Sequence, residues 1–383
     1  MHFTVQSPHL LRPTSAVFPS HPPRTPSSYT SQLWEITTDS KINVLFVFLP
    51  FVLFPVGSSI VTFVTSLLVI MPLANTLGIL TEDIALSQST AIATLINVTF
   101  GSATEFIINL ALMSAGEFDL IQYSLLGSVL SNMLLDLGMS IVIYGLRPSS
   151  PNMNFNPQAV RVYSSVLMLM SFAFFVPMTV VLVHNIDVIG MSRQIALVLC
   201  VMYITYLVFQ LRTHADMFAT SDDVEYYASR FSLSVCFVCM AVLACLLSVA
   251  SNAFVSNIET TIEHLHLTRH FIGVILIPMV GNAPEHVSTT TQAYKGNLDI
   301  SFGIAIGSSI QISCFVVPLL VLIAWAFGQP LSMNFQPFST IIMFVSVIVL
   351  NQNLRTTTGT CHWLNGALLM FSYAMLCIAF LHV

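Results

Sequence analysis

Long apolar runs alternate with short polar breaks from Lys41 onward, and this pattern predicts a series of membrane-spanning helices. The runs are continuous, unlike the alternating strands of a membrane barrel. A helix needs about 20 residues to cross the hydrocarbon layer. We expect eleven spans, the first of which is short and holds Pro50 and Pro55. Their approximate ranges are 42–57, 59–81, 86–114, 119–146, 160–184, 190–211, 231–257, 270–294, 297–327, 334–351 and 361–382.

The first 40 residues follow a different pattern, because they are rich in Ser, Thr and Pro and contain no apolar run. This composition predicts a disordered cytosolic tail. It does not resemble a signal peptide, which needs an apolar segment near Met1. We expect the rest of the chain to form an extra N-terminal helix (41–58), a first transmembrane repeat (59–211), an acidic cytosolic linker (212–230) and a second transmembrane repeat (231–383).

The basic residues indicate how the chain is oriented. With a cytosolic N-terminus and eleven spans, only Arg193 and Arg269 of the 11 Lys and Arg residues fall on the far side. Cytosolic loops of membrane proteins carry such an excess of basic residues. We therefore predict that the N-terminus is cytosolic and that the C-terminus lies on the other side. The nine cytosolic residues are Arg12, Arg24, Lys41, Arg147, Arg161, Arg212, Arg230, Lys295 and Arg355.

Composition supports an all-α polytopic membrane protein whose main partner is the lipid bilayer. Charged residues make up 7% of the chain and apolar residues 55%, whereas soluble domains are about 25% charged. The net charge of −6 and the absence of a basic cluster exclude nucleic-acid binding. Cys236 and Cys239 have CxxC spacing, but they lie inside an apolar run and are interpreted as core residues.

An internal repeat indicates a class of function. When residues 95–140 are placed over 275–320, an offset of 180, seven positions are identical. The first copy covers the third and fourth spans and the second covers the eighth and ninth. Because these lie five helices apart, the second copy is inverted in the membrane. Inverted repeats are typical of secondary transporters, whose substrate site lies between the repeats near the midplane. The pairs are Gly101 and Gly281, Ala103 and Ala283, Glu105 and Glu285, Gly116 and Gly296, Asp119 and Asp299, Gly127 and Gly307, and Ser128 and Ser308.

Glu105 and Glu285 are the candidate cation- and proton-binding residues. Each lies in a GxAxE motif inside an apolar span with no Lys or Arg nearby. An intramembrane acid costs about 2.5–3.5 kcal/mol on insertion scales, so two of them require an explanation. One explanation is a pair of protonated, hydrogen-bonded carboxyls with a structural role. The other, which we favour, is that the two glutamates bind whichever of a cation or protons is present.

Two facing carboxylates suit a hard divalent cation whose shell is completed by neutral oxygen ligands. Competition between the cation and protons for the same carboxylates is then the simplest coupling mechanism. No catalytic residue and no cofactor are expected; the metal is transported rather than resident. The candidate path-lining residues are Ser102, Asn282, Ser128, Ser131, Ser308, Ser309 and Gln311.

From about residue 41 to the end, the chain resembles vacuolar cation/proton exchangers of the CAX type, within the Ca²⁺/cation antiporters. The resemblance lies in LINVTFGSATEFI (95–107), SLLGSVLSNMLL (124–135), FIGVILIPMVGNAPEH (271–286) and LDISFGIAIGSSIQI (298–312). It implies a ten-helix core of two inverted halves preceded by one extra helix. It also implies a vacuolar membrane location, with cytosolic Ca²⁺ or Mn²⁺ exchanged for H⁺ by Glu105 and Glu285.

The resemblance also implies an acidic cytosolic segment between the sixth and seventh spans. Here that place is taken by Asp216, Asp222, Asp223 and Glu225. A regulatory or Ca²⁺-attracting role and a merely solvated loop both remain open.

Several positions depart from the family pattern. Ser102 replaces an Asn, and Asn252 stands where span seven usually carries an acid. Asp136 replaces an apolar residue. We hypothesise that it partly restores the negative charge that is missing at Asn252; the alternative is that the change is tolerated and has no role in transport. His286 follows Glu285 directly, so a proton relay and a structural hydrogen bond are both open. These three residues, Asp136, Asn252 and His286, are candidate modulators.

Three other functions compete with the antiporter. The alternative is a non-transporting or weakly active paralogue that regulates cation homeostasis, which Ser102 and Asn252 favour and the two glutamates oppose. An intramembrane enzyme is excluded because HExxH and GxGD motifs are missing. Na⁺ coupling is disfavoured because the GNAPEH form resembles the proton-coupled branch. A homo-oligomer is compatible with the sequence.

Overall fold

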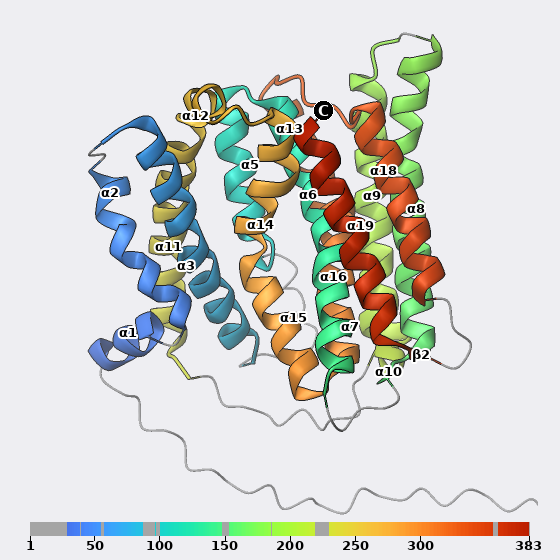
Figure 1. Ribbon diagram of the computed structural model, residues 1–383, viewed down its shortest axis with the longest axis horizontal. Coiled ribbons are helices and arrows are strands. Elements are labelled where there is room, and N and C mark those ends of the chain that lie inside the picture. The colour runs from blue at the N-terminus through green and yellow to red at the C-terminus, as the bar shows by residue number, and fades with distance from the viewer. Residues whose placement is uncertain are drawn as a thin grey trace, which may run out of the picture.

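The structure is a computed structural model that describes residues 29–38, 40–54, 57–86, 96, 100–147, 153–184, 186–218, 230–354 and 359–382. The described residues form a bundle of long helices that run roughly side by side, as the apolar runs predict (Figure 1). The first part of the chain contains α1 (Tyr29–Thr38), η1 (Lys41–Phe48), α2 (Leu49–Leu53), α3 (Ser59–Leu86), α5 (Ala103–Ala115), α6 (Phe118–Leu130), η2 (Ser131–Asp136), α7 (Leu137–Gly145), β1 (Met153–Asn154), α8 (Pro157–His184), α9 (Ile189–Val208), η3 (Phe209–Thr213) and α10 (Ala215–Phe218).

The second part repeats much of this order. It contains α11 (Leu233–Val255), α12 (Ile258–Leu265), α13 (Arg269–Phe271), η4 (Ile272–Leu276), α14 (Ile277–Gly281), α15 (Ala283–Lys295), α16 (Leu298–Gln311), η5 (Ile312–Val316), α17 (Val317–Ala326), α18 (Pro337–Leu354), β2 (Thr360–Cys361) and α19 (Trp363–His382). The strands β1 and β2 pair antiparallel in a two-stranded ribbon.

Among the described residues, eight helices are long and apolar enough to cross a membrane. The count reaches nine if Thr30–Thr38 and Lys41–Leu53, which meet at 98°, form one bent span. Two further apolar helices, Ala103–Ala115 and Arg269–Gly281, are shorter. The polytopic, all-helical class is therefore confirmed. The eight are Ser59–Ala85, Phe118–Gly145, Pro157–His184, Ile189–Thr213, Leu233–Val255, Leu298–Ala326, Pro337–Leu354 and Trp363–His382.

The N-terminal segment differs from the expectation in one respect. Helix α1 (Tyr29–Thr38) lies within the last part of the range 1–40 that we expected to be a disordered tail. Its presence is explained by contacts, because α1 packs against η1 and the amide of Asn43 donates a hydrogen bond to the carbonyl of Ile36. Residues 1–28 lie outside the described residues.

The repeated glycines of the sequence form the same turn in both halves. Gly116 ends α5 with φ of 79°, and Gly296 ends α15 with φ of 105°. A left-handed residue at this position costs little for glycine and is the usual end of a helix. In both turns the next residue donates a backbone hydrogen bond of 2.9 Å, Glu117 to Leu112 and Asn297 to Gln292. The identical glycines therefore encode identical helix ends.

Both halves also contain a π-helical turn directly after this shared region. The turn η2 follows α6 and the turn η5 follows α16, and the two overlap when shifted by 180 residues. A π-helical turn inside an α-helix is rare and frequently marks a functional site. The repeat therefore extends from sequence identity to an uncommon backbone feature.

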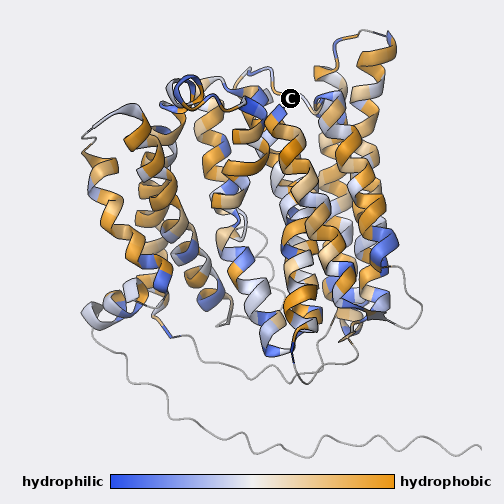
Figure 2. Ribbon diagram, in the orientation of Figure 1, coloured by the Kyte–Doolittle hydropathy of each residue, from blue (hydrophilic) through white to orange (hydrophobic). Residues whose placement is uncertain are grey.

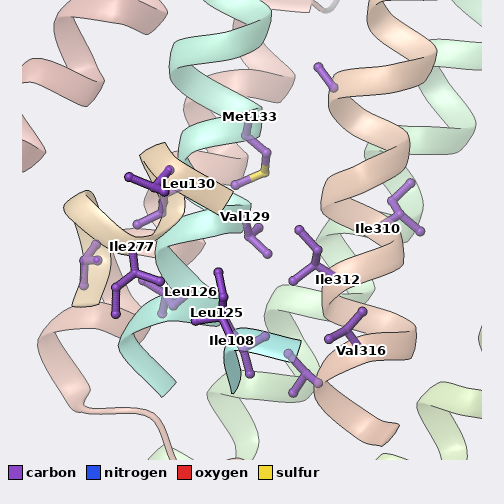
Figure 3. Close-up of a cluster of buried hydrophobic side chains, with 14 of the residues drawn as sticks. Ile108, Leu125, Leu126, Val129, Leu130, Met133, Ile277, Ile310, Ile312 and Val316 are labelled. Carbon is purple, nitrogen blue, oxygen red and sulfur yellow. The ribbon is translucent and has the colours of Figure 1, made fainter. Parts of the chain in front are cut away.

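Apolar side chains from both halves fill the middle of the molecule. Figure 3 shows a buried cluster with contributions from α5, α6, η2, α14, α16 and η5. Among its residues, Ile108, Val129 and Ile310 are at most 2% exposed. On the outside of the bundle, large apolar side chains such as Val198 and Phe371 are exposed. Figure 2 shows predominantly hydrophobic helices, in orange, around the bundle. An apolar outer surface is what contact with lipid requires.

Candidate cation-binding site

A cavity of about 700 Å³ contains both candidate glutamates. Glu105 from α5 and Glu285 from α15 line it together with residues of α3, α8, α9 and α16. The cavity extends to Glu82 near the end of α3 and to Asp299 at the start of α16, which lie at the end of the bundle drawn lowest in Figure 1. A water-accessible path therefore joins the two acids to one face of the molecule.

The backbone explains why the acids lie where they do. Helix α14 ends at Gly281, α15 begins at Ala283, and Asn282 between them has the non-helical dihedrals φ −89° and ψ 4°. Ser102 precedes α5 in the same way, so each glutamate lies in the first turn of its helix. The partial positive charge of a helix N-terminus stabilises a carboxylate there. The GxAxE motif thus places an acid in the first turn of a helix in each half, and in the second half that helix follows a break at Asn282.

Glu285 is held by a short chain of amides. The amide of Asn132, in η2, donates a hydrogen bond of 2.8 Å to Oε2 of Glu285. Asn282 in turn donates to Oδ1 of Asn132 over 3.1 Å. The hydroxyl of Ser308 lies within hydrogen-bonding reach of Glu285. The carboxylate is therefore oriented by residues of both halves.

Glu105 has fewer partners. It is 4% exposed, and its Oε2 has no hydrogen-bond partner among the described residues. Gly281 leaves the space beside it open, since a methyl group there would lie 3.9 Å from Oε1 of Glu105. Oδ1 of Asn282 and Oγ of Ser102 are likewise buried without a partner in the part of the chain that is described. Unpartnered buried oxygens are costly, and a bound cation would satisfy them.

The oxygen atoms around the cavity are suitable ligands for a hard cation, although few of them carry a charge. The described residues contain no group of three or more His, Cys, Asp and Glu side chains arranged to hold a metal. A cation in this cavity would therefore depend on two carboxylates and on neutral oxygens of amides, hydroxyls and backbone carbonyls. Such ligands are typical of Ca²⁺, whereas zinc prefers nitrogen and sulfur.

A second buried polar cluster lies next to Glu285. Oδ1 of Asp136 is 3.2 Å from Nδ1 of His286, an ion-pair distance without hydrogen-bond alignment, and it accepts a hydrogen bond from Thr289. Nε2 of His286 lies 3.1 Å from the hydroxyl of Ser131. Asp136 is fully buried and ends η2, so this cluster joins η2 to α15. The structure thus brings two candidate modulators together.

The other predicted residues are divided between the cavity and its surroundings. Ser308 and Gln311 line the cavity. Ser309 is buried and donates to the carbonyl of Ala305, whereas the carbonyl of Ser128 lies 3.5 Å from the amide of Asn282. Asn252 is exposed on α11. Asp216 lies in α10, and Asp222, Asp223 and Glu225 lie outside the described residues.

Sequence reasoning missed two acids and one amide. Asn132 binds Glu285 directly, and Glu82 lines the cavity. Asp83 is buried and accepts backbone hydrogen bonds from Arg230 (2.8 Å) and Phe231 (3.1 Å), so it joins α3 to the start of α11. Asn132 lies inside the predicted span 119–146, so a polar side chain in an apolar run was the available signal for it. Glu82 and Asp83 fall in the predicted break between 59–81 and 86–114, where acids are expected and give no signal.

Two repeated halves, each with a carboxylate in the first turn of a central helix, are typical of an ion-translocating membrane protein. Comparison with known proteins makes this assignment specific. The chain belongs to the sodium/calcium exchanger protein family, whose family model matches residues 58–212 and 235–382. The match falls on two stretches, as expected for a chain of two repeated halves. The family is one of ion exchangers and not of enzymes.

Two relatives cover almost the whole chain. A vacuolar calcium ion transporter of Schizosaccharomyces pombe is 33% identical over 91% of this chain and 86% of its own length. A Ca²⁺/H⁺ antiporter of Synechocystis is 34% identical over 90% of this chain and 98% of its own. The names of both relatives agree with the resemblance to cation/proton exchangers.

Solved structures share the fold. Native YfkE superimposes with a TM-score of 0.76 at 26% identity, covering 89% of this chain and all of that one. The H⁺/Ca²⁺ exchanger CAX superimposes with a TM-score of 0.70 at 14% identity, covering 91% of this chain and 89% of that one. Because the identity is low, this second likeness is evidence for the fold alone.

Proposed function

We propose that this protein is a Ca²⁺/H⁺ antiporter that moves cytosolic Ca²⁺ into an acidic vacuole in exchange for H⁺. The observation that carries the proposal is the position of Glu105, which is buried, and Glu285, which is half-buried: two acids from different halves that line one cavity. The relatives named as a vacuolar calcium ion transporter and as a Ca²⁺/H⁺ antiporter support the choice of ions and of membrane.

Competition for the two carboxylates couples the ions. Deprotonated Glu105 and Glu285 supply the negative charge that Ca²⁺ needs, and the unpartnered oxygens of Asn282 and Ser102 extend its shell. When Ca²⁺ leaves, protons take its place on the carboxylates, because two bare charges in a medium of low dielectric constant are costly. Mn²⁺ is a second candidate ion, since it also prefers carboxylate and carbonyl oxygens.

The two ends of the site differ. One end is the open cavity, which reaches Glu82 and Asp299. Toward the other end, Ile108 and Leu112 extend along α5 beyond Glu105 and are buried in the apolar core, where Figure 3 shows Ile108. Gly127 of α6 also meets η4 so closely that a methyl group there would lie 2.1 Å from the carbonyl oxygen of Val274. We assign this state as open to the cytosol; release on the far side requires α6 and η4 to separate.

The topology follows from the same proposal. In an eleven-span topology with a cytosolic N-terminus, the eight long helices and the bent N-terminal pair supply nine spans, and the short apolar helices Ala103–Ala115 and Arg269–Gly281 are parts of the other two. The two transmembrane repeats are then 59–211 and 231–383, preceded by the helix 41–58. The linker 212–230 faces the cytosol, where its acids attract Ca²⁺ to the cavity.

Transport into sealed vesicles tests the proposal. Purified protein in vesicles with an acidic interior is expected to take up Ca²⁺, and a protonophore is expected to abolish uptake. Glu285→Gln and Glu105→Gln are expected to remove uptake, whereas the matched control Glu263→Gln, an exposed acid on α12, is expected to retain it.

The outcomes separate the alternatives. Uptake of Mn²⁺ but not Ca²⁺ would change the ion and keep the mechanism. No uptake of either ion by folded protein would favour a non-transporting paralogue, with Ser102 and Asn252 as its signature. Normal uptake by both glutamate variants would refute the role of the two acids.

A further inference from the structure

A groove of about 1450 Å³ lies outside the cation path, between α8 of the first half and α18 of the second. The two helices pack against each other along their length and lie side by side in Figure 1. Because the groove is on the outer surface of the bundle, it opens toward the lipid. None of the transport residues described above lines it.

One end of the groove is polar and its interior is apolar. Arg161, His362 and Asn351 line the polar end, and Figure 2 shows the end of α18 there in blue. Leu169, Phe172 and Phe344 line the apolar part. Leu169 is 49% exposed and Phe172 is 58% exposed. The groove therefore has the two-part character of a lipid molecule, with a polar head and apolar chains.

The length of the groove matches one leaflet. Arg161 and Phe172 are eleven residues apart on α8, which corresponds to about 16 Å along a helix. Half of the hydrocarbon core of a bilayer is about 15 Å thick. An acyl chain that starts near Arg161 would therefore end near Phe172.

The polar end is positively charged and rigid. No acidic residue is among the described residues that line the groove, and Arg161 is exposed with no ion pair in the described part of the chain. Asn365 fixes the rim by donating to the carbonyl of Asn353 over 3.2 Å and by accepting from the backbone of His362 over 3.1 Å. The ribbon β1–β2 ties the chain before α8 to the chain before α19. The charge therefore has a defined place.

A buried side-chain oxygen at the polar end indicates that a ligand of the groove should also donate a hydrogen bond. Oδ1 of Asn351 is buried and has no hydrogen-bond partner among the described residues. Leaving such an atom without a partner costs free energy, so a ligand that donates a hydrogen bond is favoured. A phosphate group cannot donate once it is ionised, whereas a hydroxyl group can.

We propose that this groove is a binding site for an anionic phospholipid with a hydroxyl-bearing headgroup. Arg161 binds the phosphate, Asn351 accepts from a headgroup hydroxyl, and one acyl chain lies along Leu169 and Phe172. Basic pockets between transmembrane helices commonly bind such headgroups. Since α8 and α18 belong to different halves, the lipid joins the two halves at their edge.

Native mass spectrometry of the delipidated full-length protein tests the proposal. Phosphatidylglycerol and phosphatidylcholine with the same acyl chains are added separately, and the retained lipid is counted. The wild type is expected to prefer phosphatidylglycerol by about fivefold, because a basic residue at a membrane surface attracts an anionic lipid by about 1 kcal/mol. Arg161→Gln is expected to remove the preference.

Controls separate the groove from general surface charge. Arg212→Gln removes an exposed arginine that does not line the groove and is expected to keep the preference. Ser165→Glu places a carboxylate one helical turn from Arg161 and is expected to remove the preference if Arg161→Gln fails to fold. Size-exclusion chromatography checks that each variant is folded.

Three results would overturn the proposal. The first is equal retention of the two lipids by the wild type, which would indicate annular lipid only. The second is loss of the preference in Arg212→Gln to the same extent as in Arg161→Gln. The third is displacement of phosphatidylglycerol by inorganic phosphate at millimolar concentration, which would indicate an anion site with no role for the acyl chains.

Discussion

Replacing Asp136 by valine is expected to weaken both stability and cation binding. The side chain is fully buried, faces His286 at 3.2 Å and accepts a hydrogen bond from Thr289. Thr289 does not lose its last partner in the variant, since its hydroxyl also lies 2.9 Å from the carbonyl oxygen of Glu285. The contact that disappears without replacement is therefore the one with His286.

Two opposing free-energy terms set the size of the effect on stability. Breaking a buried charged pair by removing one partner costs about 3–5 kcal/mol. Removing an acid from the membrane interior regains about 2.5–3.5 kcal/mol. The difference is a net loss of about 1 kcal/mol, or roughly 1 °C in the midpoint of thermal unfolding for a chain of this size.

The effect on transport tests whether Asp136 restores negative charge to the site. Asp136 interacts electrostatically with Glu285, and a unit charge about 10 Å from a divalent cation contributes about 3 kcal/mol at an effective dielectric constant of about 20. The KM for Ca²⁺ uptake into vesicles is therefore expected to rise by about a hundredfold or more in Asp136→Val. Asp136→Asn, which keeps the shape, should show the same KM with better stability. Unchanged KM in both variants would refute the charge hypothesis.

Three further predictions concern packing, position and ligand binding. Gly127→Ala is expected to destabilise the protein by about 1–3 kcal/mol in a thermal unfolding assay, because the new methyl group meets the carbonyl of Val274. Gly78→Ala should instead stabilise α3 by about 0.5–1 kcal/mol in the same assay, because its methyl group meets no described atom within 4 Å. Asn252→Asp is expected to leave the KM for Ca²⁺ unchanged, since the side chain is exposed, and a lower KM would place it in the path. Ca²⁺ at 100 times its Kd should stabilise the wild type by about 2.7 kcal/mol, a chelator should reverse this, and Glu105→Gln should show no such gain.

The sequence predicted the features that the membrane penalises most. An acid within an apolar run is expensive, so Glu105 and Glu285 were visible without a structure, and the offset of 180 residues paired them. The repeated glycines were visible for a similar reason, since they are identical in both halves. What they do became clear only from the backbone, where Gly116 and Gly296 end their helices with positive φ.

Other parts of the site depend on helix rotation and packing, which a single sequence does not determine. Asn132 was not selected because an amide carries no charge penalty, yet it binds Glu285. Asn252 was selected from the family resemblance, but on α11 it is exposed while its neighbour Ser251 is fully buried. One residue turns a helix by about 100°, so adjacent positions face different surroundings.

The paired π-helical turns have a consequence for the history of the chain. A π-helical turn holds one residue more than an α-helical turn, so everything after it is rotated by about 100° relative to an uninterrupted helix. In η2 that rotation brings Asp136 toward His286. An insertion found at the same place in η2 and η5 is most simply inherited from a single ancestral half that already contained it before the gene was duplicated. The extra residue is therefore older than the asymmetry between the halves, and the difference between Asp136 and its counterpart Val316 belongs to the divergence that followed the duplication.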